Sequence, residues 1–141
     1  MTKNIEISII TLLIDISLII ILFTQKLNKF ELNIIYFVFI VHFIFLYALQ
    51  KNNRYLIDTM HIIFVIYIYV LSFFAKNIYL LLLFLSLFIM MILYWIIDKK
   101  CPIGEYNTIP FIHNIIETYP HYIIWTLTII PIYSLLKRIL K

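Results

Sequence analysis

Long apolar runs recur along the chain, and they constrain its fold more than any other feature. Hydrophobic residues make up 65% of the 141 residues and charged residues 13%, with a mean hydropathy of +1.05. A soluble domain is about half apolar and about a quarter charged, and this chain has too few polar groups to cover its apolar surface. The bilayer is the expected solvent, and the length predicts one integral membrane domain over residues 1–141.

Five segments have the length and hydropathy of membrane-spanning helices. They are residues 5–23, 32–49, 56–75, 78–97 and 121–136. A helix rises about 1.5 Å per residue, so about 20 residues cross a hydrocarbon core of about 30 Å. The runs are too long for barrel strands and lack the alternation that such strands need. The sequence predicts an all-α, polytopic transmembrane helical bundle with four or five membrane-spanning helices.

The last segment decides between four and five spans. With four spans, eight of the 11 basic residues lie on the inner side together with both termini, and the positive-inside rule favours this topology. Hydropathy favours five spans, because residues 122–136 carry no charge. We expect five, with the N-terminus outside and the residues up to Pro120 lying along the interface.

The basic residues lie mostly in short links between the apolar runs, with a net charge of +4. This pattern predicts contact with lipid headgroups and no nucleic-acid binding. The single Gly excludes glycine-mediated helix contacts, so we expect bulky side chains to pack against other membrane helices, of the same or another chain. The abundance of residues with AT-rich codons predicts an AT-rich genome and leaves an organellar, viral or cellular membrane open.

Asp15 is the clearest polar anomaly, because it lies near the middle of the first apolar segment. A carboxylate at this depth costs roughly 2.5–3.5 kcal/mol on insertion scales, so it is expected to face protein or water. Asn4, Ser8 and Thr11 precede it on the same helical face. Two interpretations follow: a proton or cation relay, or a protonated acid bonded to a neighbouring helix.

Asp58 and His61 are three residues apart and lie on one helical face. Metal sites and proton shuttles both use an imidazole oriented by a carboxylate. Asp58 also lies in the first turn of its segment, where an acid is favoured by the helix dipole alone. The dipole interpretation is the simpler one, and the site remains the alternative.

His113, Glu117 and His121 are spaced four residues apart, so a continuous helix would align them. Two histidines and one carboxylate can bind a metal, but Pro120 tends to end or kink the helix just before His121. A buried polar cluster and solvated interfacial side chains are the alternatives. The complete candidate intramembrane polar site comprises Asp15, Asp58, His61, His113, Glu117 and His121.

Three further residues are weaker candidates. His42 lies alone in the second apolar segment, and it is either a haem ligand or, more simply, a hydrogen-bonded packing residue. Cys101 follows Lys99 and Lys100, which favours a reactive or palmitoylated thiol. The run from Trp95 through Cys101 to Glu105 resembles a tryptophan–Cys-Pro–acid signature of small multi-span membrane families, and that resemblance implies no function.

The chain contains no P-loop, H-E-x-x-H motif or nucleophile elbow, so an enzyme is the least favoured class and no cofactor is expected. Two functions remain. The first is a non-catalytic subunit or accessory component of a membrane assembly. The alternative is a small proton or cation permeation protein, or a metal-handling protein, that uses the intramembrane acids and histidines.

Overall fold

The computed structural model describes residues 2–98, 108–110 and 120–140. These residues form five helices and contain no strand, which confirms the all-α prediction. The helices are α1 (Thr2–Thr24), α2 (Lys29–Gln50), α3 (Arg54–Phe74), α4 (Ile78–Asp98) and α6 (Pro120–Ile139). Their bounds lie within a few residues of the five predicted apolar segments.

Three helices of the described part are long and apolar enough to cross a membrane. They cover Asn4–Thr24, Lys29–Gln50 and Arg54–Phe74, with mean hydropathies of 2.6, 2.3 and 2.0. In α4, residues Ile78–Tyr94 form a shorter apolar helix. These helices fit an integral membrane protein, as the sequence predicted, while the count of four or five spans stays a prediction.

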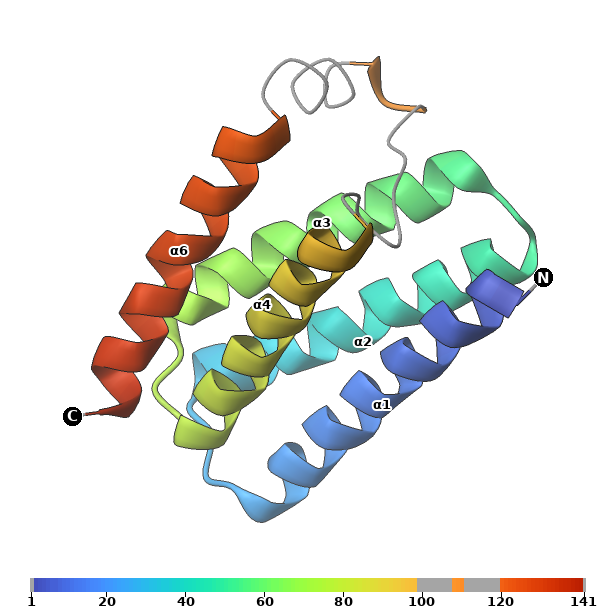
Figure 1. Cartoon of the computed structure of the whole chain (residues 1–141). Helices are drawn as coiled ribbons and strands as arrows, with labels where there is room; N and C mark the ends of the chain where they lie inside the picture. Colours follow the sequence, from blue (N-terminus) through green and yellow to red (C-terminus); the bar gives the residue numbers. More distant parts are fainter. Residues whose placement is uncertain (1, 99–107, 111–119, 141) are drawn as a thin grey trace.

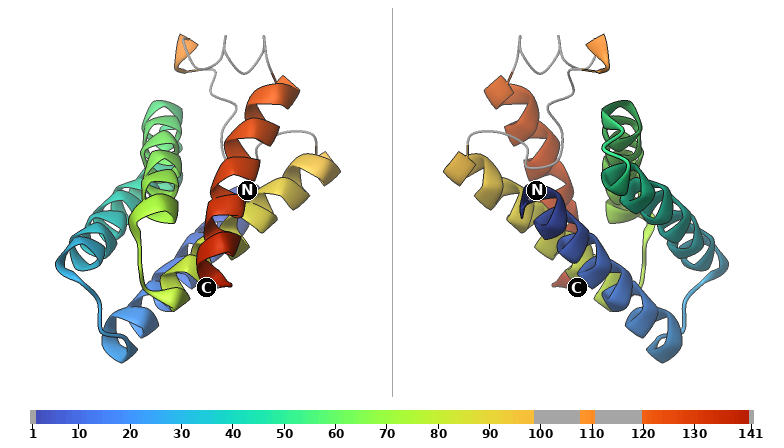
Figure 2. Two further views of the ribbon diagram at one scale, coloured as in Figure 1. Left: turned by 90° about the vertical axis from the view of Figure 1, so that its left-hand side faces the viewer. Right: turned by 90° about the vertical axis from the view of Figure 1, so that its right-hand side faces the viewer.

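The first four helices close into a ring, and α6 packs outside it. In this ring α1 packs on α2, α2 on α3, α3 on α4 and α4 on α1, while α6 contacts α3 and α4. Consecutive helices run in opposite directions (Figure 1). Figure 2 shows α2 and α3 on one flank and α4 and α6 on the other, with the flanks diverging away from the α3–α4 link.

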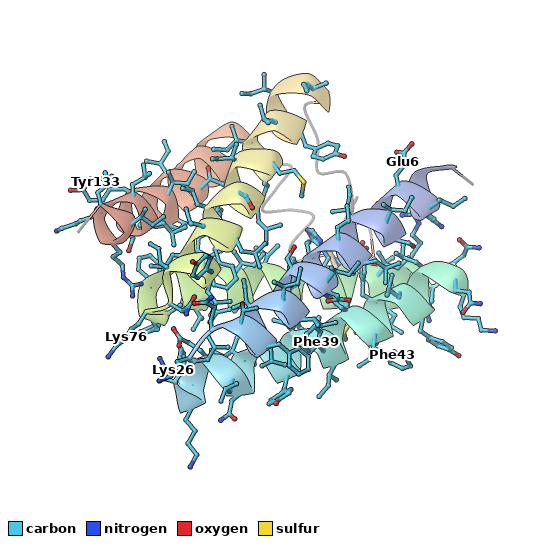
Figure 3. The ribbon with its side chains drawn as sticks, turned by 90° about the horizontal axis from the view of Figure 1, so that it is seen from below. Glu6, Lys26, Phe39, Phe43, Lys76 and Tyr133 are labelled. Carbon is cyan, nitrogen blue, oxygen red and sulfur yellow. The ribbon has the colours of Figure 1, made fainter. Side chains whose placement is uncertain are left out.

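The helix ends gather at two ends of the bundle. The amino end holds the N-terminus, the α2–α3 link, the end of α4 and the start of α6 (Figure 1). The carboxyl end holds the α1–α2 link, the α3–α4 link and the C-terminus. In Figure 3, Lys26 and Lys76 lie at the carboxyl end and Glu6 lies toward the amino end.

Apolar side chains both fill the bundle and cover its outside. Leu18, Ile35 and Phe88 are among the buried residues of the main core. Large apolar residues are also exposed on the outer faces, including Leu13 and Ile40, each 57% exposed. A soluble helix carries polar residues opposite its buried face. The exposed faces of this bundle are therefore matched to an apolar surrounding.

An asparagine begins each of three helices by capping its backbone. The side chains of Asn28 and Asn53 accept hydrogen bonds from Glu31 N and Leu56 N at the starts of α2 and α3. The Asn77 side chain accepts bonds from Tyr79 N and Leu80 N at the start of α4. Asparagine is among the best residues for pairing the free N–H groups of a helix start, so these links set where the helices begin.

Candidate functional site

Asp15 of α1 forms a direct contact with His42 of α2. The distance from Asp15 Oδ1 to His42 Nδ1 is 2.5 Å. The two side chains are 17% and 4% exposed, and both residues lie near the middle of their helices. Asp15 therefore faces a protein partner, and the two residues join helices that are adjacent in the ring.

The Asp15–His42 pair is electrically neutral when it holds one proton, whichever side chain carries that proton. Removing the proton leaves a net negative pair and adding a second leaves a net positive one, and both are costly in an apolar interior. The contact with His42 therefore offsets the desolvation cost that a lone acid would have at this depth. The His42 ring also packs against Phe64 of α3, with ring centroids 4.5 Å apart and planes tilted by 58°.

Asp58 lies near the start of α3 and is 2% exposed. Its Oδ2 atom accepts a hydrogen bond of 2.5 Å from Thr108 Oγ1. Its Oδ1 atom is buried, and within the described part of the chain it has no hydrogen-bond partner. Ionised carboxylates normally accept several hydrogen bonds, so Asp58 is an unusually under-bonded acid.

Two buried polar residues of α3, Asp58 and His61, lie between the amino end and the Asp15–His42 pair. Asp58, His61 and Phe64 follow one another at steps of three residues, or about 4.5 Å of helix rise each, and Phe64 contacts His42. His61 is buried like Asp58. Two of the predicted site residues therefore share the flank of α3 that approaches the pair containing Asp15.

A small cavity with an apolar exposed lining lies beyond the Asp15–His42 pair, toward the carboxyl end. A cavity of about 10 Å³ lies among α1 to α4 there, with Ile14, Leu18, Ile35 and Ile68 in its wall. A cavity of this size has room for about one water molecule, but its exposed lining is apolar and such cavities stay dry. The wall also includes Glu31, whose oxygens are bonded to backbone N–H groups.

Glu31 is a buried acid that the sequence analysis did not single out, and it lies between the first two predicted segments. Its Oε2 accepts a hydrogen bond from Asn28 N at 2.9 Å, and its Oε1 accepts bonds from Lys76 N at 2.6 Å and Asn77 N at 2.8 Å. It is 2% exposed. One carboxylate therefore joins the α1–α2 link to the α3–α4 link, and the Asn-x-x-Glu spacing of a capping box is the signal that could have identified it.

Arg138 of α6 makes a second contact at the carboxyl end. Its Nη1 atom donates to Ser72 O at 3.0 Å, and its Nη2 atom donates to Ala75 O. These carbonyls belong to the last turn and cap of α3, where free carbonyl groups favour a cation. The sequence analysis did not single out Arg138, whose side chain joins α6 to α3.

Four of the predicted residues, Cys101, Glu105, His113 and Glu117, lie outside the described residues. His121 belongs to α6, but its side chain is also outside them. The residues that are described contain no group of three or more His, Cys, Asp or Glu side chains able to hold a metal ion. The metal interpretation of His113, Glu117 and His121, and the haem interpretation of His42, therefore stay predictions.

We compared the chain with known protein families, curated proteins and solved structures, and it matches none of them. The geometry of the described residues is therefore the basis for a functional proposal.

Proposed function

We propose that the chain is a multi-pass integral membrane protein with five spans that serves as a non-catalytic component of a membrane assembly. The main support is the distribution of polarity. Large apolar side chains cover the outer faces of the helices, while the inward polar groups Glu31, Arg138, Asp15 and His42 bond to other parts of the chain. Those bonds hold helices together and leave the outer faces for lipid or partner helices.

The arrangement of charged and aromatic residues supports five crossings. The exposed Lys26, Lys29, Lys76 and Lys137 belong to the carboxyl end. Exposed tyrosines lie toward both ends of the bundle, with Tyr79 at the start of α4 and Tyr55 at the start of α3. Lysines and tyrosines at helix ends mark membrane interfaces. Because α6 runs from the amino to the carboxyl end, a fifth crossing would bring the C-terminus to the side of these lysines.

The outer face of α4 is the favoured contact with a partner helix. Ser86 is exposed near the middle of α4, and the exposed Leu82, Ile89 and Leu93 lie on the same face. In membranes, small residues such as serine allow helices to approach closely. Ser86 Oγ bonds to Leu83 O within its own helix, so it needs no water and can lie in a helix–helix contact.

Co-purification from a mild detergent tests this role. The full-length chain is expected to elute with a second copy or with other membrane proteins, and Ser86→Phe is expected to weaken that association by blocking close approach. Ser17→Phe on α1 is the matched control, because Ser17 also bonds to its own helix and is exposed. A wild-type chain that elutes as a lone monomer, or equal losses for both variants, would contradict the proposal.

A second candidate function is proton handling, and the Asp15–His42 pair supports it. A buried acid–imidazole pair at the middle of two helices is the type of group that proton relays use. In vesicles, this function predicts that the wild-type chain dissipates a pH gradient and that Asp15→Asn does not. The accessory role predicts no flux from either variant, and the dry apolar cavity beyond the pair favours that outcome.

A further inference from the structure

The carboxyl end of the bundle gathers lysines from separate parts of the chain. Lys26 lies in the α1–α2 link and Lys29 begins α2. Lys76 lies in the α3–α4 link, and Lys137 belongs to the last turn of α6. All four side chains are exposed, and Figure 3 shows the labelled Lys26 and Lys76 at the same end of the bundle.

Buried hydrogen bonds hold these lysines at one surface. Glu31, two residues after Lys29, accepts bonds from backbone N–H groups of both links, including that of Lys76. Arg138, the residue after Lys137, donates to carbonyl groups at the end of α3, directly before the second link. The backbone positions of the lysines are therefore set by contacts in which their own side chains take no part.

The positive charge of this surface is not balanced by the acids that the structure describes. At the carboxyl end the one described acid is Glu31, which is buried and bonded to backbone N–H groups. None of the four lysines forms a salt bridge with a described residue. Toward the amino end, in contrast, the exposed Lys51 and Arg54 share the surface with the exposed Glu6.

Exposed aromatic side chains border the lysines. Phe23 is 83% exposed and lies three residues before Lys26, and Phe74 is 63% exposed and lies two residues before Lys76. A lysine beside apolar surface covers it with its methylene stem and extends its ammonium group to the polar side. A soluble acidic partner would match the charge alone, whereas a lipid with an anionic headgroup and acyl chains matches both features.

We propose that the carboxyl end is a binding surface for anionic lipids. Their headgroup phosphates lie among Lys26, Lys29, Lys76 and Lys137, and their acyl chains lie against the neighbouring phenylalanines. A basic residue close to the membrane surface raises the affinity for anionic lipid about fivefold. Anionic lipids are concentrated in the cytoplasmic leaflet, so the surface orients the carboxyl end toward the cytoplasm.

The inference goes beyond the accessory role proposed above, which requires no particular lipid. It also goes beyond the sequence, which predicted headgroup contact for all the basic links alike. The structure distinguishes the two ends, because among the described residues it leaves the lysines of the carboxyl end unpaired and places an exposed acid near the cations of the amino end.

Native mass spectrometry of the full-length chain, released from a mild detergent, tests the proposal. When phosphatidylglycerol and phosphatidylcholine with the same acyl chains are supplied at equal concentrations, the wild-type chain is expected to bind phosphatidylglycerol preferentially. Combining Lys26→Gln with Lys76→Gln is expected to weaken phosphatidylglycerol binding by roughly tenfold or more. Combining Lys51→Gln with Arg54→Gln is the matched control, because it removes the same charge from exposed residues of the amino end, and its effect is expected to stay below about threefold.

The wild-type chain keeps the test decisive if a variant fails to fold. Salt screens exposed charges, so the preference for phosphatidylglycerol is expected to fall between about 0.1 M and about 1 M salt. Equal binding of the two lipids, a preference that salt leaves unchanged, or an equal loss in both double variants would each overturn the proposal. Displacement of the lipid by inorganic phosphate at the same concentration would also overturn it, because the site would then bind a free anion. The accessory role is tested by co-purification instead, so the two proposals can fail separately.

Discussion

The carboxyl end and the amino end of the bundle differ in how they satisfy a buried acid. At the carboxyl end, Glu31 accepts bonds from two separate links, and Arg138 binds the last carbonyls of α3 nearby. Toward the amino end, Asp58 has a single bond, from Thr108. The backbone also differs between the two ends. In Figure 2 the two helical flanks converge toward the α3–α4 link and diverge away from it.

The two acids differ in their hydrogen bonds and not in their burial. Glu31 and Asp58 have the same exposure, so burial alone does not distinguish them. A fully bonded acid stabilises the fold and has little capacity to bind anything else. An acid with an unpaired oxygen contributes less to the fold. Among the described residues, the carboxyl end is therefore the end whose buried acid is fully bonded, and the amino end is the one whose buried acid is not.

The largest expected effect comes from Glu31→Ala. The substitution leaves the N–H groups of Asn28, Lys76 and Asn77 without their acceptor, and each unpaired buried group costs about 1–3 kcal/mol. The free energy of unfolding, measured by detergent-induced unfolding, is expected to fall by about 3–5 kcal/mol. The control is Glu6→Ala at an exposed acid of α1, with a change within about 0.5 kcal/mol; equal effects would remove the contrast between the two ends.

The Asp15–His42 pair lies between the two ends and is expected to have an intermediate effect. Asp15→Asn is expected to lower the free energy of unfolding by about 2 kcal/mol, between the values for polar contacts in membranes and for buried pairs in soluble proteins. A double-mutant cycle with His42→Gln is expected to give a coupling energy of about 1 kcal/mol. Ser17→Ala is the control on α1, and a coupling energy near zero would mean that the 2.5 Å contact does not stabilise the fold.

Arg138→Ala is expected to lower the free energy of unfolding by less than Glu31→Ala or Asp15→Asn does. It removes two donors from carbonyls at the end of α3, and a hydrogen bond to a charged group contributes about 1.5–3 kcal/mol before side-chain entropy is considered. We expect a loss of about 1–2 kcal/mol in the same unfolding measurement. Lys137→Ala, at the exposed neighbouring residue, is the control; a loss as large for Lys137 would attribute the effect to charge near the membrane surface.

Asp58→Asn is expected to have the smallest effect. Asparagine has a similar shape and keeps an acceptor for Thr108, and the Oδ1 atom of Asp58 has no partner among the described residues. The free energy of unfolding is therefore expected to change by less than about 1 kcal/mol. Comparison with Glu31→Gln sharpens the contrast, because that substitution discharges a fully bonded anion and is expected to cost more. A larger loss at Asp58 than at Glu31 would contradict the contrast between the two ends.

The positions of the helices were predictable because hydropathy is a local property. The five apolar segments of the sequence coincide with α1, α2, α3, α4 and α6 to within a few residues. A run of apolar residues forms a helix in an apolar surrounding whatever it packs against, since its backbone groups must bond internally. The depth of Asp15 was also readable, because it follows from counting residues along one helix.

The partners of the polar residues were not predictable, because each partner is far away in the chain. His42 lies 27 residues from Asp15, Thr108 lies 50 from Asp58 and Lys76 lies 45 from Glu31. The sequence analysis treated Asp15 and His42 as separate candidates and did not single out Glu31. Only the Asn28–Glu31 capping box is a local signal.

The sequence by itself determined that the chain is helical, where its helices lie and that its surroundings are apolar. Those properties depend on side-chain chemistry and on spacing within about one helix. The tertiary structure decided which buried acids are bonded and which are not, because that depends on how the helices pack. The different hydrogen bonding of Glu31 and Asp58 therefore depends on the folded bundle.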